Sequence, residues 1–378
     1  MPLCLHERLA EASTRKCLPS VIAYNRIDGP GSSLDLREFQ QSLWVLPEIP
    51  NDFTSDPSAK WSKNLPRTIG ITIDIGTKIE AHPYEPNKIS VESIDYQTVV
   101  SGKIGEIAPS KNNWLLKILE IFNITGVKFI LSNTSPHTTS SGLGGSATAT
   151  TGVCLLANEL AGRPMDSIQL VSLASRIEQD FGVSITGTQE QSNVIFGGIT
   201  DYIWFPWGIP GKPETSYGES IRYELLNNSS YDEIKNRIAI FHLGFTRSSI
   251  NVNSSWRKAL FTRKGFALHR KKMALAYDFR EGIRLKDWER IYHSINNYRL
   301  IRTELCQAYM EGAIDLSKNA ENQECCVFPL GAGGGGAVLI FSTEPEKLLQ
   351  FKTTIQDEFK EINFNICSRG NKLQNLSV

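Results

Sequence analysis

The chain has 378 residues, which exceeds the usual size of one compact domain and favours two domains that share a cleft. Its 40 Lys and Arg residues balance 40 Asp and Glu residues, so no overall charge attracts the protein to nucleic acid or to an anionic membrane surface. The seven cysteines are scattered, without C-x-x-C spacing or a dense disulfide framework, which fits reduced thiols in a cytosol.

The N-terminal segment MPLCLHERLAEASTRK contains charges early and lacks the apolar centre of a secretion signal. No apolar run approaches the roughly 20 residues that span a bilayer. We therefore expect a cytoplasmic protein that has neither a membrane nor a nucleic acid as its partner.

The first half of the chain predicts a mixture of strands and helices. Residues 69–82 alternate apolar and polar positions, as a half-buried strand does, and a partner strand is expected at 89–94. Residues 38–66 are rich in Pro, Ser, Asn and Asp, and they are either a long ordered loop or lid or a flexible surface insertion. A helix over 114–122 and a strand over 127–131 follow.

A glycine-rich run at 142–145 separates that strand from an apolar segment that reaches Leu160 and predicts a helix. A second helix over 166–181 follows the Gly-Arg-Pro break at 162–164. We expect the first domain to span residues 1–225.

Residues 226–378 are predicted to form the second domain. Its expected elements are a buried strand at 237–243, helices over most of 249–318, strands before and after the glycine run 331–336, a helix over 345–359 and a short strand at 361–366.

The segment 135–160, SPHTTSSGLGGSATATTGVCLLANEL, places small residues where a strand turns into a helix. A helix N-terminus offers unpaired N–H groups to phosphate, and glycines let the backbone approach the phosphate oxygens. Ser146 and Thr148 can add donors or a metal ligand, and His137 can touch phosphate. A glycine turn that only permits close helix packing is the alternative interpretation.

Two known nucleotide motifs compete for this loop. No G-x-x-x-x-G-K-[ST] string is present, which disfavours a P-loop NTPase. Gly142, Gly144 and Ala147 match the spacing G-x-G-x-x-A, so a dinucleotide site stays open. The position of the loop deep in the chain, and the absence of a strand with an acidic end after the helix, weigh against that site.

Three motifs resemble those of the GHMP kinases, which include galactokinase, homoserine kinase, mevalonate kinase and phosphomevalonate kinase. PHTTSSGLGGSATAT is similar to their phosphate loop P-x-x-x-G-L-G-S-S-A. NRIDGPGSSLDL, at 25–36, keeps the Arg and the Asp of the first motif at the same separation, as Arg26 and Asp35. GAGGGG, at 331–336, and the strand AVLIF after it resemble the third motif.

Within that superfamily the chain resembles the D-glycero-D-manno-heptose 7-phosphate kinase branch. Its members carry R-I-S-F-x-G-G-G-T-D-L and Q-D-Q-x-x-x-x-F-G-G, and this chain has GTQEQSNVIFGG at 187–198. The resemblance implies an α+β fold of two domains, a ribosomal-protein-like N-terminal domain and a ferredoxin-like C-terminal domain, with the active site between them.

The resemblance also implies roles for single residues. Catalysis falls to Glu190 and Ser146, and Mg²⁺ to Ser146 and Glu178. The residues implied for ATP are Ser141, Gly142, Leu143, Gly144, Gly145, Ser146 and Ala147, and those implied for the acceptor are Arg26, Asp35, Gln189, Gly333 and Gly334. The simpler interpretations are an exposed helix carboxylate for Glu178, a helix N-terminal residue for Ser146, a turn for Asp35 and a surface position for Arg26.

Two positions depart from the family pattern. Glu190 stands where related kinases have a catalytic Asp, and Gly145 stands where they have a loop Ser. A carboxylate that is one methylene longer requires a shifted backbone, a different acceptor, or lost catalysis, because misplacement by about 1 Å can cost on the order of 100-fold in rate.

The sequence therefore predicts an ATP- and Mg²⁺-dependent kinase that phosphorylates a sugar or a sugar phosphate, with an anomeric hydroxyl as one candidate acceptor. A catalytically weak or inactive GHMP-fold protein that binds sugar or nucleotide is the main alternative, and a dinucleotide oxidoreductase is the third. Whether the protein forms a homodimer is left open.

Overall fold

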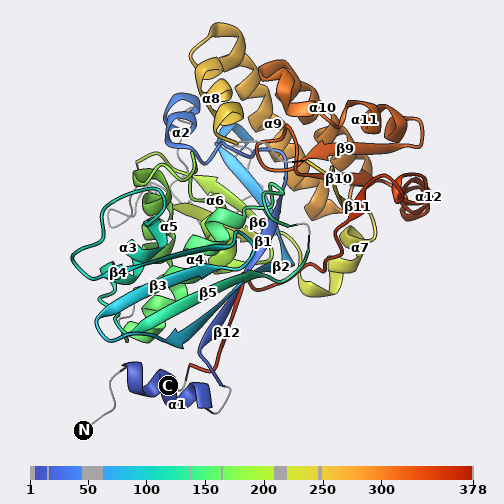
Figure 1. The fold of residues 1–378 in the computed structure, drawn as a ribbon. Helices are drawn as coiled ribbons and strands as arrows, with labels where there is room; N and C mark the ends of the chain where they lie inside the picture. Colours follow the sequence, from blue (N-terminus) through green and yellow to red (C-terminus); the bar gives the residue numbers. More distant parts are fainter. Residues whose placement is uncertain are drawn as a thin grey trace.

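The structure is a computed structural model that describes residues 5–14, 17–44, 63–136, 138–162, 165–207, 219–245 and 249–376. Its described residues form two lobes, each built on a β-sheet. In Figure 1 the larger sheet lies in the lower half of the molecule, and the helices α8 to α11 lie above it.

The first lobe contains an eight-stranded sheet. Its strands are β1 (Ser20–Asp28), β2 (Arg67–Pro83), β3 (Lys88–Ser93), β4 (Thr98–Lys103), β5 (Val127–Asn133), β6 (Ile199–Trp204), β7 (Ser220–Glu224) and β12 (Asn371–Gln374). The order is β12-β1-β2-β5-β3-β4, with β6 paired to β2 and β7 paired to β6. All pairs are antiparallel except β3 with β5.

The long strand β2 holds this sheet together. Its first part, Arg67–Ile71, pairs with β6, and its last part, Thr77–Pro83, pairs with β5. The pairing of β1 with β2 shifts register between Tyr24 and Arg26. Such a shift re-aims the side chains that follow it, and Arg26 and Asp28, two residues apart, then lie on one face of β1.

In the part of the chain that the structure describes, five helices pack in this lobe: α1 (Leu5–Thr14), α3 (Trp114–Ile121), α4 (Gly145–Ala161), α5 (Ser167–Asp180) and α6 (Gln189–Phe196). Helix α2 (Arg37–Leu43) instead packs through Phe39 and Leu43 on α8 and α9 of the second lobe. A continuous apolar core joins α3, α4 and α5 to the sheet. Gly152 of α4 lies against Ile79 and Ala23, where an added Cβ would be 2.4 Å from the Ile79 side chain. Helix α4 therefore packs closely on β1 and β2, which fixes where its N-terminus lies.

The second lobe contains a four-stranded antiparallel sheet of order β11-β8-β10-β9. Its strands are β8 (Ile238–His242), β9 (Cys325–Pro329), β10 (Ala337–Ser342) and β11 (Lys360–Glu361). Its helices are α7 (Tyr231–Lys235), α8 (Ser249–Leu260), α9 (Arg263–Leu285), α10 (Trp288–Leu305), α11 (Ile314–Glu321) and α12 (Pro345–Ile355), with short 3-10 turns η2 (Asn228–Ser230) and η3 (Gln307–Met310).

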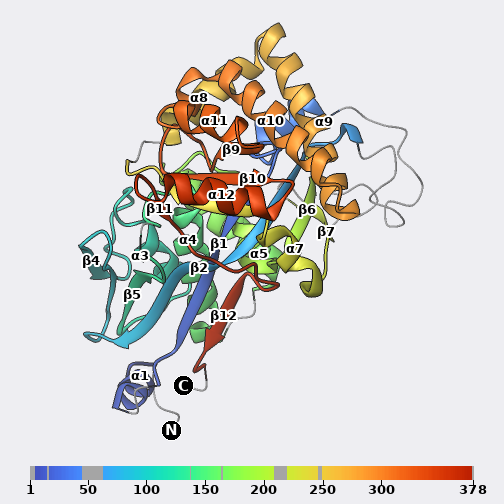
Figure 2. The same cartoon turned by 90° about the vertical axis from the view of Figure 1, so that its right-hand side faces the viewer.

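Both faces of this second sheet are covered. Leu339 and Phe341 of β10 belong to the core that includes α9 and α10, whereas Val338 and Ile340 belong to the core that includes α8, α11 and α12. In Figure 2, α12 lies in front of β10, and α8 to α11 lie above it. A strand that is buried on both faces is apolar throughout, which is why AVLIF reads as a continuous apolar run.

The α+β fold class predicted from the sequence is confirmed, and the helix expected at 166–181 is α5, with Asp166 as its capping residue. The interpretation of 38–66 as loop or insertion is wrong at its start, because α2 covers Arg37–Leu43 and buries Phe39 and Leu43. Residues 45–62 lie outside the described residues.

Smaller corrections concern the C-terminal end. The strand expected at 361–366 is only β11, Lys360–Glu361, followed by an isolated bridge between Ile366 and Ile73. The helix expected to reach 359 ends at Ile355.

The domain boundary near residue 225 stays a prediction. The last described strand, β12, pairs with β1 and so belongs to the first sheet. Among the described residues, no helix is both long and apolar enough to cross a bilayer.

Candidate active site

The phosphate loop predicted at 141–147 joins β5 to α4, as the sequence indicates. Gly142 and Gly144 have positive φ values of 83° and 86°, and Gly144 is the N-cap of α4. No side chain caps this helix and its first turn has no acidic residue. The N–H groups of the first turn are therefore free to bind an anion, and the positive end of the helix dipole adds to the attraction.

The loop is anchored at both ends. Leu143 is buried, and its carbonyl accepts a hydrogen bond of 3.3 Å from the Arg26 N–H. The Ser141 hydroxyl donates to the Thr138 carbonyl at 2.7 Å. The Thr148 hydroxyl donates to Asn25 Oδ1 at 2.8 Å. These contacts of Leu143, Ser141 and Thr148 hold the loop in place, and Ser141 lines the cleft together with Gly144, Gly145 and Ser146.

Ser146 and Glu178 meet at the N-terminus of α4. The Ser146 hydroxyl donates to Glu178 Oε1, and Gln191 Nε2 donates to Oε2 at 2.6 Å. Glu178 comes from α5 and is fully buried, and burial raises the pKa of its carboxyl to about 8. The hydrogen bonds from Ser146 and Gln191 act against this rise, and a cation close to the carboxyl would lower its pKa further.

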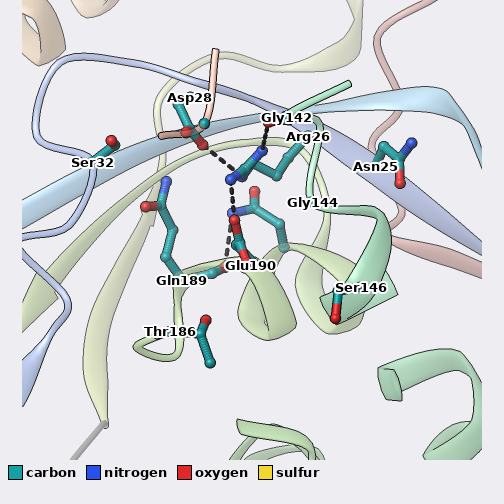
Figure 3. Close-up of polar contacts among 12 residues, drawn as sticks. Asn25, Arg26, Asp28, Ser32, Gly142, Gly144, Ser146, Thr186, Gln189 and Glu190 are labelled. Atoms are coloured by element: carbon teal, nitrogen blue, oxygen red, sulfur yellow. Dashed lines mark hydrogen bonds and ion pairs between the residues drawn. The ribbon is translucent and has the colours of Figure 1, made fainter. Parts of the chain in front are cut away.

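A second cluster surrounds Arg26, as Figure 3 shows. Its guanidinium pairs through Nη2 with Glu190 Oε1 and through Nε with Asp28 Oδ1, and Nη1 donates to the Gly142 carbonyl at 3.0 Å. Arg26 is therefore buried among protein acceptors. Glu190, in the first turn of α6, keeps 27% of its side chain exposed to the cleft.

Asp35 lies near this cluster and fixes the start of α6. Its Oδ2 accepts a hydrogen bond of 3.0 Å from the Gln189 N–H, and Gly187 packs so closely on it that an added Cβ would be 2.2 Å from the same oxygen. Burial raises the pKa of Asp35 to about 6. The Gln189 side chain is buried and donates to the Ile69 carbonyl at 3.4 Å.

The C-terminal glycine run closes the cleft from the second lobe. Gly331 and Gly142 approach each other so closely that a Cβ on Gly331 would be 2.7 Å from the Gly142 carbonyl oxygen. The Gly334 N–H donates to the Tyr309 carbonyl at 2.8 Å, and a Cβ on Gly333 would be 2.1 Å from the Tyr309 ring. Glycine is required here because the two lobes touch through their backbones.

These segments enclose a cleft of about 340 Å³. The predicted site residues that line it are Arg26, Asp35, Ser141, Gly142, Gly144, Gly145, Ser146, Gln189, Glu190 and Gly333. Leu143, Ala147, Glu178 and Gly334 lie behind its wall, and His137 lies outside the described residues. A hollow of about 600 Å³ on another face, between Asp74 and Lys352, contains none of the motifs.

The sequence reasoning missed several residues that line the same cleft: Asp28, Ser32, Ser33, Tyr96, Lys111, Thr186, Asn253 and Trp256. Asp28 follows Arg26 by two residues, so strand alternation would have placed it beside Arg26, but the strand Ser20–Asp28 was not predicted from the sequence. Trp256 and Asn253 lie on one face of α8, in the second lobe, and no local pattern links them to the glycine loop.

Comparison with known proteins agrees with this geometry. Residues 113–198, which contain the loop, α4, α5 and α6, match the family model described as GHMP kinases N terminal domain. No curated protein matches the sequence significantly.

Solved structures resemble the whole chain. A D-glycero-D-manno-heptose 1-phosphate kinase from Bacteriodes thetaiotaomicron is 15% identical with a TM-score of 0.66, covering 94% of this chain and 98% of that one. The Lactococcus lactis galactokinase complexed with galactose is 16% identical, with a TM-score of 0.59 and coverages of 97% and 98%. The Streptococcus pneumoniae phosphomevalonate kinase, in complex with phosphomevalonate and AMPPNP, is 10% identical, with a TM-score of 0.64 and coverages of 92% and 99%.

Identities this low show the fold alone, and the family match adds the region that carries the phosphate loop. The chain thus has a fold similar to that of the GHMP kinases, and its residues 113–198 match the family model of their N-terminal domain.

Proposed function

We propose that this protein transfers the γ-phosphoryl group of ATP to a hydroxyl of a sugar or a sugar phosphate, in a Mg²⁺-dependent reaction. One observation carries the proposal: a single cleft joins the free N-terminus of α4 to the carboxylate of Glu190, with the Ser146–Glu178 pair beside the loop. A phosphate donor at one end and a proton acceptor at the other are what phosphoryl transfer to an alcohol requires.

ATP would place its phosphates on the N–H groups of Gly144, Gly145 and Ser146. Arg26 links this end of the cleft to the acceptor end, because one guanidinium contacts both the Gly142 carbonyl and Glu190. The nicotinamide alternative finds less support, since the helix after the loop is followed by helix α5 rather than by a strand.

Ser146 and Glu178 fit a Mg²⁺ ion. Both offer oxygen, the ligand atom that Mg²⁺ prefers, and Mg²⁺ commonly takes one or two protein ligands with phosphate oxygens and waters. The described residues contain no cluster of three His, Cys, Asp or Glu side chains, so a metal held by the protein alone is not supported there. Bound in this place, Mg²⁺ would neutralise charge on the transferred phosphate.

Glu190 is the residue that would orient the acceptor hydroxyl and take its proton. Its side chain is 27% exposed and can reach a ligand in the cleft, whereas Asp28 and Asp35 are only 1% and 5% exposed. An anomeric hydroxyl is more acidic than other sugar hydroxyls and needs less help from a base, which would tolerate Glu in place of Asp.

The acceptor we favour is a sugar phosphate of the heptose 7-phosphate type. Its support is the GTQEQSNVIFGG segment and the likeness to a heptose 1-phosphate kinase at 15% identity. We place the reaction in the cytoplasm. All six cysteines of the described residues are free, which fits a reducing compartment.

The test is ATP turnover with and without Mg²⁺ over a panel of sugars and sugar phosphates, including heptose 7-phosphate, with phosphomevalonate as a non-sugar acceptor. Phosphorus NMR identifies the product and the phosphorylated hydroxyl. We expect transfer to at least one sugar-type acceptor and none without metal. Tight nucleotide binding with no transfer to any acceptor would instead support the inactive binding protein.

A further inference from the structure

Arg26 lies between two carboxylates that come from distant parts of the chain. Asp28 is on the same face of β1 and contacts Nε, at 2.5 Å, whereas Glu190 is on α6 and contacts Nη2. The third arm, Nη1, donates to the Gly142 carbonyl. Asp28 is 1% exposed and lines the cleft. Figure 3 shows Asp28 and Glu190 approaching the guanidinium from different sides.

We propose that Asp28 is a positioning residue for the transfer step: it holds Arg26 from the side away from α6 and thereby places Glu190 against the acceptor. The inference rests on the proposed function, because Glu190 is there the residue that meets the acceptor hydroxyl. Phosphate binding at the glycine loop and the proposed role of Glu190 do not by themselves imply any role for Asp28.

The geometry of guanidinium supports this role. The group is planar, with donors in a rigid fork, so two fixed arms determine where the third one points. The Gly142 carbonyl accepts a hydrogen bond from Nη1, and the Asp28 carboxylate attracts the Nε side of the group in an ion pair of 2.5 Å. The remaining arm then faces Glu190, whose longer side chain would otherwise sample several rotamers at the cleft surface.

The charges around Asp28 allow it to be ionised at neutral pH. The groups that face it are Arg26 and Arg302, which lower its pKa, and Glu190 and Asp35, which raise it. Burial has the largest effect, and the pKa is raised to about 6. Above that pH the carboxylate is charged and holds Arg26.

A double-mutant cycle tests the inference. We expect Asp28→Ala to lower kcat about 10- to 100-fold, because a displaced guanidinium misplaces Glu190, with little change in KM for ATP. Asp28→Asn keeps an acceptor atom for Nε and is expected to lose less. In a Glu190→Gln background, Asp28→Ala should have almost no further effect on kcat. Losses that multiply in the double variant would overturn the inference.

Asp201→Asn is the matched control. Asp201 is equally buried in the same sheet and pairs with Arg67 and Arg280, away from the cleft. We expect this variant to lose stability while the folded fraction keeps its kcat. If it lowered kcat as much as Asp28→Ala does, the effect would be one of general stability and the inference would be wrong.

A crystal structure of Asp28→Ala gives a readout that needs no turnover. We expect the Arg26 guanidinium to move away from Glu190, and an unchanged Arg26–Glu190 pair would contradict the inference. The proposed function fails separately, if the wild-type protein transfers phosphate to no acceptor of the panel.

Discussion

The two ends of the cleft are built in different ways. At the phosphate end one continuous segment, 141–147, supplies most of the contacts, and α5 adds Glu178. At the acceptor end five separate segments meet: β1, the 31–36 loop, α6, α8 and the glycine run after β9. The first end depends on local backbone geometry, whereas the second depends on how the whole fold is assembled.

The forces also differ between the two ends. The phosphate end relies on N–H groups and on glycines with positive φ, and it contains a single buried carboxylate. The acceptor end relies on buried charges. Burial raises the pKa of both Asp28 and Asp35 to about 6, and it lowers the pKa of Lys272 well below its usual value.

Helices of the second lobe hold the loop that carries Asp35. Lys272 Nζ, from α9, donates to the Ser32 carbonyl and the Ser33 hydroxyl, both at 2.8 Å. Arg302, from α10, donates to the Gly331 carbonyl at 2.7 Å and stacks 3.9 Å from the Trp256 ring centre. The acceptor end is thus shaped by residues that never touch the cleft.

Of the variants at the two ends of the cleft, we expect the largest loss of activity from a change of Glu190. Glu190→Gln removes the proposed proton acceptor and is expected to lower kcat by about 100-fold or more, with the KM for ATP nearly unchanged. Steady-state kinetics on the true acceptor measures both constants. Glu92→Gln, on β3 and paired with Lys128, is the control and should leave kcat intact. Full turnover of Glu190→Gln would remove the carboxylate from the chemistry.

The close contact between the lobes predicts a loss of stability. Gly142→Ala would force Ala to a φ of 83° and bring its Cβ to 2.7 Å from the Leu330 carbonyl oxygen, and we expect it to lower the free energy of unfolding by about 2 kcal/mol. Gly145→Ala, with no atom within 4 Å and no positive φ, should cost nothing measurable. Denaturant melts that show equal stability for both variants would contradict the predicted strain.

Ser146→Ala tests whether the phosphate end of the cleft also binds Mg²⁺. It removes one proposed metal ligand and the hydrogen bond to Glu178, and we expect the Mg²⁺ concentration for half-maximal rate to rise about 10-fold. Turnover measured over a Mg²⁺ series at fixed ATP gives this value. If the metal dependence does not change, Ser146 is not part of the metal site.

The smallest expected effect is the pH dependence of stability. Asp28 and Asp35 have folded pKa values of about 6, above the unfolded value near 3.9, so the folded protein binds more protons between these limits. The free energy of unfolding should fall as pH rises from about 4 to about 6. Asp28→Asn should make the free energy of unfolding less dependent on pH in this range, by an amount on the order of 1 kcal/mol per pH unit. A slope that is identical in wild type and variant would contradict a raised pKa at Asp28.

Sequence patterns predicted the strands and helices of the first lobe well, since period, capping and glycine positions act over a few residues. The capping residue Asp166 and the turn at Gly142–Gly144 are examples. The beginning of the segment 38–66 was misjudged, because its polar composition hid the buried face of α2, formed by Phe39 and Leu43. The resemblance to GHMP kinases, rather than spacing, singled out Ser146 and Glu178 together.

By itself, then, the sequence determined the glycine loop before α4 and the helices after it, because glycine positions and helix caps are local properties, and its motifs carried the resemblance that implied the α+β class. The strand that places Arg26 and Asp28 on one face is known from the structure. Only the tertiary structure decided that Arg26 meets Glu190, 164 residues away, and that α8, α9 and α10 shape the acceptor end. Such contacts depend on sheet register and on the packing of one lobe against the other, which no short window of residues encodes.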